Sequence, residues 1–165
     1  MKIGFTGTRK GMTGDQAVRF MKLLDHLVQE EARAKRGELH EFHFGVCVGA
    51  DQQAAEIAAW GGFKIVGHPG AVPWKWAGSM PTLGSPARKV VLPIELPLNR
   101  DHTIVDVTDV LVVTPKQQAT PEFRNDPSVR RGSGTWATVR YAADKVFKPV
   151  WFVWPNGTAE RFLAI

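Results

Sequence analysis

Residues 42–60 read FHFGVCVGADQQAAEIAAW, in which a short apolar run passes through a glycine directly into a helical pattern. The run from Phe42 to Val48 predicts a strand, and small and apolar residues then recur on one face of a helix over residues 50–60. A second apolar run, Phe63 to Gly67, follows this helix closely. Strand, helix and strand in this order predict a βαβ unit, because two parallel strands need a crossover connection between them.

The same alternation continues on both sides of this unit. Before it, a strand over residues 2–5 leads to a capping box of Thr13 and Gln16 and to a helix that ends near residue 35. After it, we predict a helix over residues 99–107, a strand over 110–114, a helix over 133–146 and a strand over 149–154. The 165 residues therefore predict a single α/β domain, a mostly parallel sheet flanked by helices in three layers.

Two long segments interrupt this pattern. Residues 68–98 contain six prolines and two tryptophans, Trp74 and Trp76, without a clear period. Because the segment leaves the expected ligand edge directly after a strand, we interpret it as a lid, with a disordered insert as the alternative. Residues 89–94 within it have the character of a short extra strand, and residues 115–131 form a second, polar loop.

Composition narrows the class of protein. A formal net charge of +5 and an isoelectric point of about 9.6 favour an anionic partner, either a nucleotide, a nucleic acid or an acidic protein surface. No apolar run approaches the roughly 20 residues of a bilayer crossing, and the chain opens on a strand rather than a signal peptide. We therefore expect a cytoplasmic protein without a membrane partner.

Cysteine and histidine give little sign of metal or redox chemistry. The single cysteine, Cys47, lies within an apolar run and is interpreted as a packed thiol rather than a nucleophile. The five histidines and this cysteine show no zinc-ligand spacing. We expect neither a bound metal nor a cofactor.

Four short motifs stand at equivalent places, each just beyond a strand or at the start of a helix. They are Gly7-Thr8-Arg9, Gly49-Ala50-Asp51, Asn99-Arg100-Asp101 and Gly132-Ser133-Gly134-Thr135. In a parallel sheet these places lie along the carboxyl edge of the strands, where α/β proteins bind ligands. We therefore expect all four motifs to meet in one crevice.

The last motif is typical of a phosphate site. Gly132 and Gly134 have no Cβ, so the backbone can approach a ligand while its N–H groups and the helix dipole point at negative charge. The structural alternative is a helix start that is merely well capped by Ser133.

The first two motifs offer complementary chemistry. Gly7 permits a tight turn, after which Thr8 and Arg9 present a hydroxyl and a guanidinium to a phosphate. Asp51 repels phosphate but accepts hydrogen bonds from ribose hydroxyls, and a cap on its own helix is the alternative role. At the first motif the structural alternative is that Gly7 only shapes the turn and that Arg9 is exposed to solvent.

Two further residues complete the candidate site. Arg100 would point from its helix start into the crevice, with a surface ion pair to Asp101 or Asp106 as the alternative. His68, at the end of a predicted strand, is placed to contact a base or sugar, although a purely structural histidine fits equally well. A P-loop motif, and a G-x-G-x-x-G after the first strand, are both absent from the sequence.

Together the four motifs resemble the SLOG superfamily, which groups the "lonely guy" phosphoribohydrolases with DNA-processing proteins and small nucleotide-binding proteins. The likeness spans nearly the whole chain and is greatest to the small bacterial and phage branch of YpsA-related proteins. It implies a Rossmann-like sheet whose edge binds a nucleotide or nucleotide-derived ligand, with residues 132–135 on the phosphate and Arg100 nearby. Such relatives often pair, and the apolar stretches 151–154 and 162–165 are candidates for a homodimer interface.

One departure from these relatives bears on catalysis. In the resembling phosphoribohydrolases a catalytic glutamate follows the glycine-rich motif, and here Thr138 takes that place. A threonine can neither stabilise a developing ribosyl cation nor act as a base, so hydrolysis by that route is in doubt.

Three hypotheses of function follow. The first is a protein that binds a phosphorylated ribosyl ligand. The second is an N-glycosidase acting on a nucleoside monophosphate, in which Arg100 orients the phosphate and Asp51 or Asp101 supplies the carboxylate. The third, ranked lowest, is a single-stranded DNA binder that stacks bases on the two tryptophans of residues 68–98.

Overall fold

The computed structural model describes residues 1–32, 39–71, 80–118 and 133–162. A mixed β-sheet forms the centre of the molecule. Its strands are β1 (Lys2–Gly7), β2 (Glu41–Phe44), β3 (Lys64–Gly67), β4 (Lys89–Val91), β5 (Val110–Thr114), β6 (Val150–Val153) and β7 (Ala159–Phe162). They lie in the order β4-β3-β2-β1-β5-β6-β7. Neighbours pair in parallel from β4 through β6, and β7 runs antiparallel to β6.

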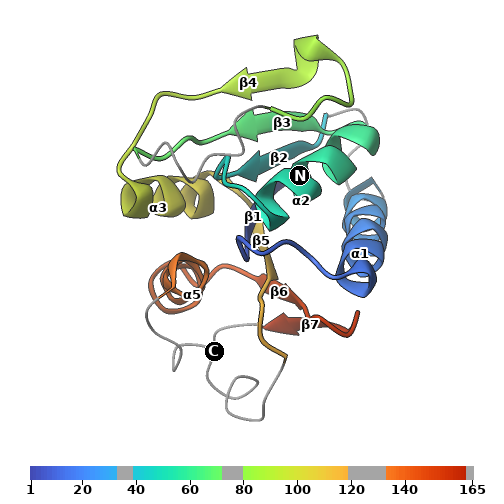
Figure 1. The fold of residues 1–165 in the computed structure, drawn as a ribbon, viewed down its shortest axis with the longest axis vertical. Helices are drawn as coiled ribbons and strands as arrows, with labels where there is room; N and C mark the ends of the chain where they lie inside the picture. The colour runs from blue at the N-terminus through green and yellow to red at the C-terminus, as the bar shows by residue number, and fades with distance from the viewer. Residues whose placement is uncertain (33–38, 72–79, 119–132, 163–165) are drawn as a thin grey trace.

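Helices cover both faces of the sheet (Figure 1). One face carries α1 (Gly14–Ala32) and α2 (Ala50–Trp60), and the other carries α3 (Pro97–Val107) and α5 (Gly134–Arg140), which continues as a π-helical turn (Tyr141–Lys145). The predicted three-layer α/β class is therefore confirmed. Within the part of the chain that is described, no helix is both long enough and apolar enough to span a membrane.

Aromatic side chains fill the core on each side of the sheet. Under α1 and α2, Phe5 packs on Phe20 and Phe42 at ring-centroid distances of 5.4 and 5.8 Å. On the opposite face, Phe152 of β6 stacks on Trp154 at 5.0 Å. Burying one such side chain contributes about 1.5–3 kcal/mol to stability.

The same packing corrects one expectation. Phe152 and Trp154 are almost completely buried inside their own chain, so they are not available for a subunit interface. The reason is α5, whose Trp136 stacks on Phe152 at 5.7 Å, and β7 in addition pairs along the outer edge of β6. β7 was not predicted from the sequence, and residues 163–165 lie outside the described residues.

Several element boundaries were predicted correctly, and others shift. α2 and β5 match their predicted ranges, whereas β1 extends to Gly7 and α3 begins at Pro97. β2 ends at Phe44, so Cys47 lies beyond the strand, where it forms an isolated bridge.

The segment 68–98 is in part a component of the sheet. β4 pairs with β3 in parallel, after a short 3-10 turn (Pro86–Arg88), and this confirms the extra strand within the segment. Residues 72–79, which include Trp74 and Trp76, lie outside the described residues, so the lid stays a prediction.

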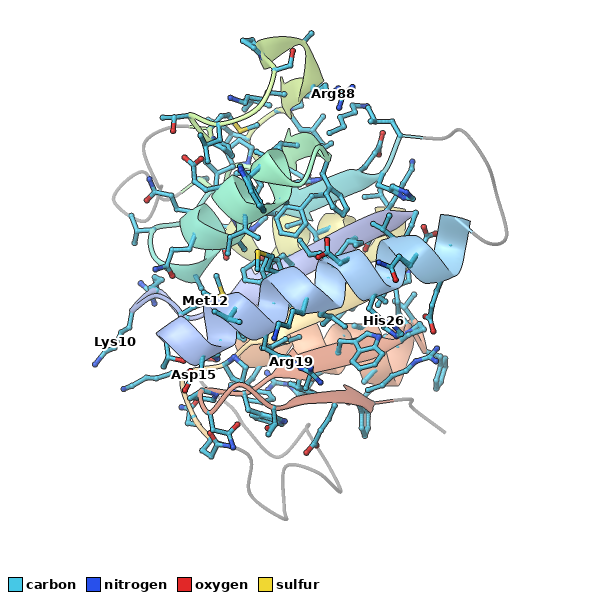
Figure 2. The ribbon with its side chains drawn as sticks, turned by 90° about the vertical axis from the view of Figure 1, so that its right-hand side faces the viewer. Lys10, Met12, Asp15, Arg19, His26 and Arg88 are labelled. Carbon is cyan, nitrogen blue, oxygen red and sulfur yellow. The ribbon has the colours of Figure 1, made fainter. Side chains whose placement is uncertain are left out.

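Helix α1 starts as its sequence predicts. Thr13 Oγ1 accepts a hydrogen bond from Gln16 N, and Gln16 Oε1 accepts one from Thr13 N, both at 3.1 Å. This reciprocal pair is the expected capping box, and it satisfies two N–H groups that a helix start otherwise leaves unpaired. Figure 2 looks onto this face, where α1 crosses the sheet and Lys10 extends outward from the loop before it.

Candidate functional site

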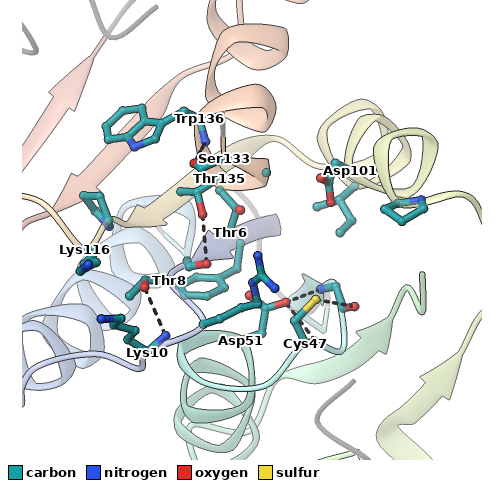
Figure 3. Close-up of a pocket in the computed structure, with 18 of the residues that line it drawn as sticks. Thr6, Thr8, Lys10, Cys47, Asp51, Asp101, Lys116, Ser133, Thr135 and Trp136 are labelled. Atoms are coloured by element: carbon teal, nitrogen blue, oxygen red, sulfur yellow. Dashed lines mark hydrogen bonds between the residues drawn. The ribbon is translucent and has the colours of Figure 1, made fainter. Parts of the chain in front are cut away.

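A cavity of about 470 Å³ opens at the carboxyl edge of the sheet, between β1 and β5 (Figure 3). The chain leaves β1 toward one side of the sheet and β5 toward the other, and ligands of α/β proteins bind at such a reversal of strand order. The polar residues that line the cavity are Thr6, Thr8, Arg9, Lys10, Cys47, Asp51, Arg100, Asp101, Lys116, Gln117, Ser133 and Thr135. Its volume lies in the usual range for small-molecule sites.

Gly7 closes the floor of the cavity because only a glycine fits there. A Cβ at this position would lie 2.6 Å from Ala50 Cβ, far inside van der Waals contact. Thr135 Oγ1 donates to the carbonyl oxygen of Gly7 at 3.0 Å, which fixes the start of α5 against the end of β1. Gly7 is thus the last residue of a strand rather than part of a turn, and it joins two of the predicted motifs.

The start of α5 leaves backbone donors on the cavity wall. Ser133 is the N-cap, and its hydroxyl oxygen accepts from Trp136 N at 3.2 Å. Gly134 and Thr135 line the cavity, and among the described residues no acceptor is recorded for their backbone N–H groups. The predicted cap and the predicted donors therefore occur together, while Gly132 lies outside the described residues.

Arg100 is the buried cation of the site. Its side chain is 7% exposed, and its Nη1 donates to the carbonyl oxygens of Gly45 and, at 3.3 Å, of His68. Its Nε lies 2.7 Å from Asp101 Oδ1. The ion pair with Asp101 therefore exists, but it is buried beside the cavity rather than exposed on the surface.

Asp51 lies close to the same guanidinium. Its Oδ2 accepts from the backbone N–H groups of Gly45 and Cys47 at 3.1 and 3.3 Å. Burial raises the pKa of Asp51 to about 7, against the opposing charge of Arg100. The N-cap of α2 is Gly49, without a side-chain cap, so Asp51 caps the preceding loop instead of its own helix.

Burial also raises the pKa of Asp101, again against the opposing charge of Arg100. Two buried carboxyl groups therefore compete for one guanidinium. If both were ionised, the cluster would carry a net negative charge in a poorly solvated place, which is unfavourable. At neutral pH the pair therefore tends to retain a proton.

Cys47 is half-buried and lines the cavity between these groups. Its Sγ lies 3.7 Å from Arg100 Nη1, and burial raises the pKa of the thiol, with Asp51 adding to the effect. A raised pKa keeps the thiol protonated, which agrees with the expected inert cysteine. Its place in the cavity wall was not predicted.

Two residues of the predicted motifs support the site without lining it. Gly49 has φ of 86°, and a Cβ there would overlap the backbone of Arg9. Ala50 N donates to the carbonyl oxygen of Thr8 at 3.0 Å. Both residues therefore hold the loop after β1 against the start of α2, and neither is among the cavity-lining residues.

His68 and Asn99 are not brought to the cavity either. Asn99 is exposed on the first turn of α3. His68 is buried, with its Nε2 2.9 Å from His43 Nδ1, and His43 Nε2 in turn lies 3.1 Å from Glu41 Oε2. These two predicted ligand residues are therefore not among those that line the cavity, although the carbonyl oxygen of His68 accepts a hydrogen bond from Arg100.

Sequence reasoning missed the lysines of the cavity. Lys10 and Lys116 lie in the loops that follow β1 and β5, and both line the cavity. Their position just beyond adjacent parallel strands was a usable signal, since that is where the other motifs were sought. Among the described residues, no group of three or more histidine, cysteine or acidic side chains is arranged to hold a metal ion.

Comparison with known proteins supports the architecture. No family model and no curated protein matches the sequence. Among solved structures, the chain is similar to the molybdenum cofactor binding protein from the phototrophic bacterium Rippkaea orientalis, with a TM-score of 0.59 and 18% sequence identity. The match covers 93% of this chain and 76% of that one. At this level of identity the likeness establishes a shared fold.

Proposed function

We propose that the protein binds a nucleotide or a nucleotide-derived ligand with a phosphoribosyl group in the cavity between β1 and β5. The observation that carries the proposal is the division of the cavity into two chemical ends (Figure 3). Lys10 and Lys116 stand at one end, and Asp51 and Asp101 stand at the other, with Thr135 between them.

The cationic end suits a phosphate. Arg9 and the lysines bring positive charge to the rim, and the N–H groups at the start of α5 add directed donors. Hydrogen bonds between charged groups and phosphate are about twice as strong as those between neutral groups. We therefore assign Thr8, Arg9 and residues 133–135 to the phosphate.

The carboxyl end suits a sugar. Asp51 and Asp101 can accept hydrogen bonds from ribose hydroxyls, and a carboxyl group that retains its proton can also donate one. Arg100 is buried and paired with Asp101, so we assign it the role of holding and partly neutralising the carboxyl pair rather than gripping the phosphate. The similar structure from Rippkaea orientalis is described as binding a molybdenum cofactor, which supports small-molecule binding on this fold.

Calorimetric titration tests the proposal, with AMP, ADP, ADP-ribose, NAD and molybdenum cofactor as ligands and adenosine as the phosphate-free control. We expect binding of at least one phosphorylated compound and much weaker binding of adenosine. Arg9→Gln should weaken that binding about tenfold, since a charge-assisted hydrogen bond is lost. Arg19→Gln, on the exposed face of α1, is the matched control and should leave it unchanged. A folded sample that binds none of these compounds would rule the proposal out.

A second candidate function is an N-glycosidase that acts on a nucleoside monophosphate. The observation that favours it is the pKa of Asp51, raised by burial to about 7, which suits proton transfer at neutral pH. Thr138, in the place of the relatives' glutamate, is buried, and its hydroxyl donates to the carbonyl oxygen of Gly134 at 2.9 Å. The carboxylate would therefore have to come from Asp51 or Asp101.

Chromatography of reaction mixtures decides between binding and hydrolysis. An N-glycosidase releases the free base from a nucleoside monophosphate, and Asp51→Ala or Asp101→Ala should abolish that release. Activity that survives both substitutions would exclude the proposed carboxylates. Salt-dependent retention of an oligonucleotide, without binding of any mononucleotide, would instead favour the single-stranded DNA hypothesis.

We also propose that two copies of the chain pair. The apolar stretch at residues 151–154 is largely buried in its own core, so another surface is needed. β4 lies at the end of the sheet, and its last residue, Val91, and the nearby Ile94 are each 57% exposed. An apolar edge strand is a natural place for two chains to meet.

A further inference from the structure

Two lysines, Lys10 and Lys116, meet at the rim of the cavity, and neither takes part in an ion pair within the described residues. Lys10 follows β1 and Lys116 follows β5, and both side chains are exposed. Figure 3 shows them at the same end of the cavity. A side-chain contact with Lys10 and repulsion by its charge lower the pKa of Lys116, in agreement with this shared position. Two like charges in this position repel each other unless an anion lies between them.

The loop that carries Lys10 is fixed by hydrogen bonds. Lys10 N donates to Thr8 Oγ1 at 3.2 Å, and Gly11 N donates to the carbonyl oxygen of Thr8 at 3.1 Å. Met12 N donates to Gln53 Oε1 of α2 at 2.6 Å. The backbone of Lys10 is therefore held at the rim by its own turn and by the neighbouring helix.

The loop that carries Lys116 is fixed by a different set of contacts. The carbonyl oxygen of Pro115 accepts from Gln16 Nε2 at 2.9 Å, and the same amide nitrogen donates to the carbonyl oxygen of Val153 at 2.9 Å. Gln16 is 1% exposed, so this anchor is buried. The backbones that carry the two lysines are thus anchored at the rim independently of each other.

No acidic side chain compensates the pair in the described part of the chain. None of the recorded ion pairs there involves Lys10, Lys116 or their neighbour Arg9. The carboxyl groups of the cavity, Asp51 and Asp101, stand at the other end next to Arg100. As far as the chain is described, the rim therefore carries positive charge that no carboxylate pairs with, beside the wall formed by Ser133 and Thr135.

We propose that Lys10 and Lys116 bind the outer phosphate of a diphosphate, so that the ligand of this cavity is a nucleoside diphosphate or a diphosphate ester rather than a monophosphate. This inference rests on the nucleotide-binding function proposed above. The inner phosphate lies against residues 133–135 and Arg9, and the outer phosphate lies between the two ammonium groups. An anion in that place turns a repulsive contact into two charge-assisted hydrogen bonds.

The test compares AMP, ADP and inorganic pyrophosphate by calorimetry at constant ionic strength. Wild-type protein should bind ADP about tenfold or more tightly than AMP, because the outer phosphate gains contacts with charged groups. The double variant Lys10→Gln, Lys116→Gln should lose most of this preference while its affinity for AMP changes little. Lys22→Gln, an exposed lysine of α1, removes the same charge elsewhere and should keep the preference.

Each alternative result has a distinct meaning. Equal binding of AMP and ADP by wild type, or equal weakening of both in the double variant, overturns the diphosphate site and leaves nucleotide binding intact. Pyrophosphate binding that the double variant abolishes, without binding of either nucleotide, supports the lysine site and counts against the nucleotide. If none of the three compounds binds, this inference falls, and the function proposed above then depends on the titrations with ADP-ribose, NAD and molybdenum cofactor.

Discussion

Gly45 shows how one missing side chain makes room for the buried charge of the site. A Cβ at this position would overlap the guanidinium of Arg100 and lie 3.0 Å from Asp51 Oδ2. We expect Gly45→Ala to destabilise the protein by about 1–3 kcal/mol, because overpacking forces neighbours to move. Gly14→Ala is the control, since a Cβ there meets nothing within 4 Å. Urea unfolding of both variants checks this, and equal stability of the two would contradict the role assigned to Gly45.

Asp51 should give the protein a characteristic dependence of stability on pH. Because burial raises the pKa of Asp51 to about 7, the folded state keeps a proton that the unfolded chain releases above roughly pH 4. For this group, the free energy of unfolding therefore falls as the pH rises from about 4 to about 7. Asp51→Asn cannot titrate, and its amide oxygen can still accept from the N–H groups of Gly45 and Cys47.

The stability of Asp51→Asn relative to wild type should accordingly increase between about pH 5 and about pH 8. Urea unfolding at several pH values measures the difference. Asp25→Asn, on the exposed side of α1, is the control and should run parallel to wild type. A difference between Asp51→Asn and wild type that stays constant with pH would mean that Asp51 does not titrate in this range.

At the scale of elements, Gln16 connects helix α1 with the ends of strands β5 and β6. It completes the capping box of α1, and its amide nitrogen donates to carbonyl oxygens just beyond β5 and at the end of β6. Gln16→Met should destabilise the protein by about 2–3 kcal/mol, because two buried carbonyl groups lose their donor. Gln52→Met, on the exposed side of α2, should change stability by less than about 0.5 kcal/mol. Thermal unfolding distinguishes them.

The capping box of α1 shows which interactions can be predicted from the sequence of a single element. Thr13 and Gln16 are three positions apart, so their interaction depends on local backbone alone, and it was predicted correctly. The further bonds of Gln16 to Pro115 and Val153 join residues that are distant in sequence. Nothing in the sequence around residue 16 indicates them.

At the scale of the whole molecule, the proposed homodimer is open to a direct test. If β4 is the contact, Val91→Lys should convert the dimer into a monomer, since a charge on an edge strand opposes pairing. Light scattering after size-exclusion chromatography measures the mass, and Val107→Lys, an exposed apolar position at the end of α3, is the control. A wild-type protein that is monomeric at high concentration would refute the pairing itself.

The sequence by itself determined the order of strands and helices, the parallel sheet and the edge at which the motifs would be sought. Apolar runs and helical periods are local patterns, and the right-handed βαβ connection turns them into a layered fold. β7 was not predicted because Glu160 and Arg161 interrupt the alternation of apolar and polar residues that indicates a strand. Its strand conformation depends on its pairing with β6.

Only the tertiary structure decided which of the motif residues form the cavity wall. Arg9, Asp51, Arg100 and Thr135 lie around one cavity, whereas His68 is buried in contact with His43. The tertiary structure also brought Lys10 and Lys116 to the same end of the cavity. Burial and neighbouring charge set the protonation of a carboxyl group or the accessibility of a cation, and both depend on contacts between residues that are far apart in the chain.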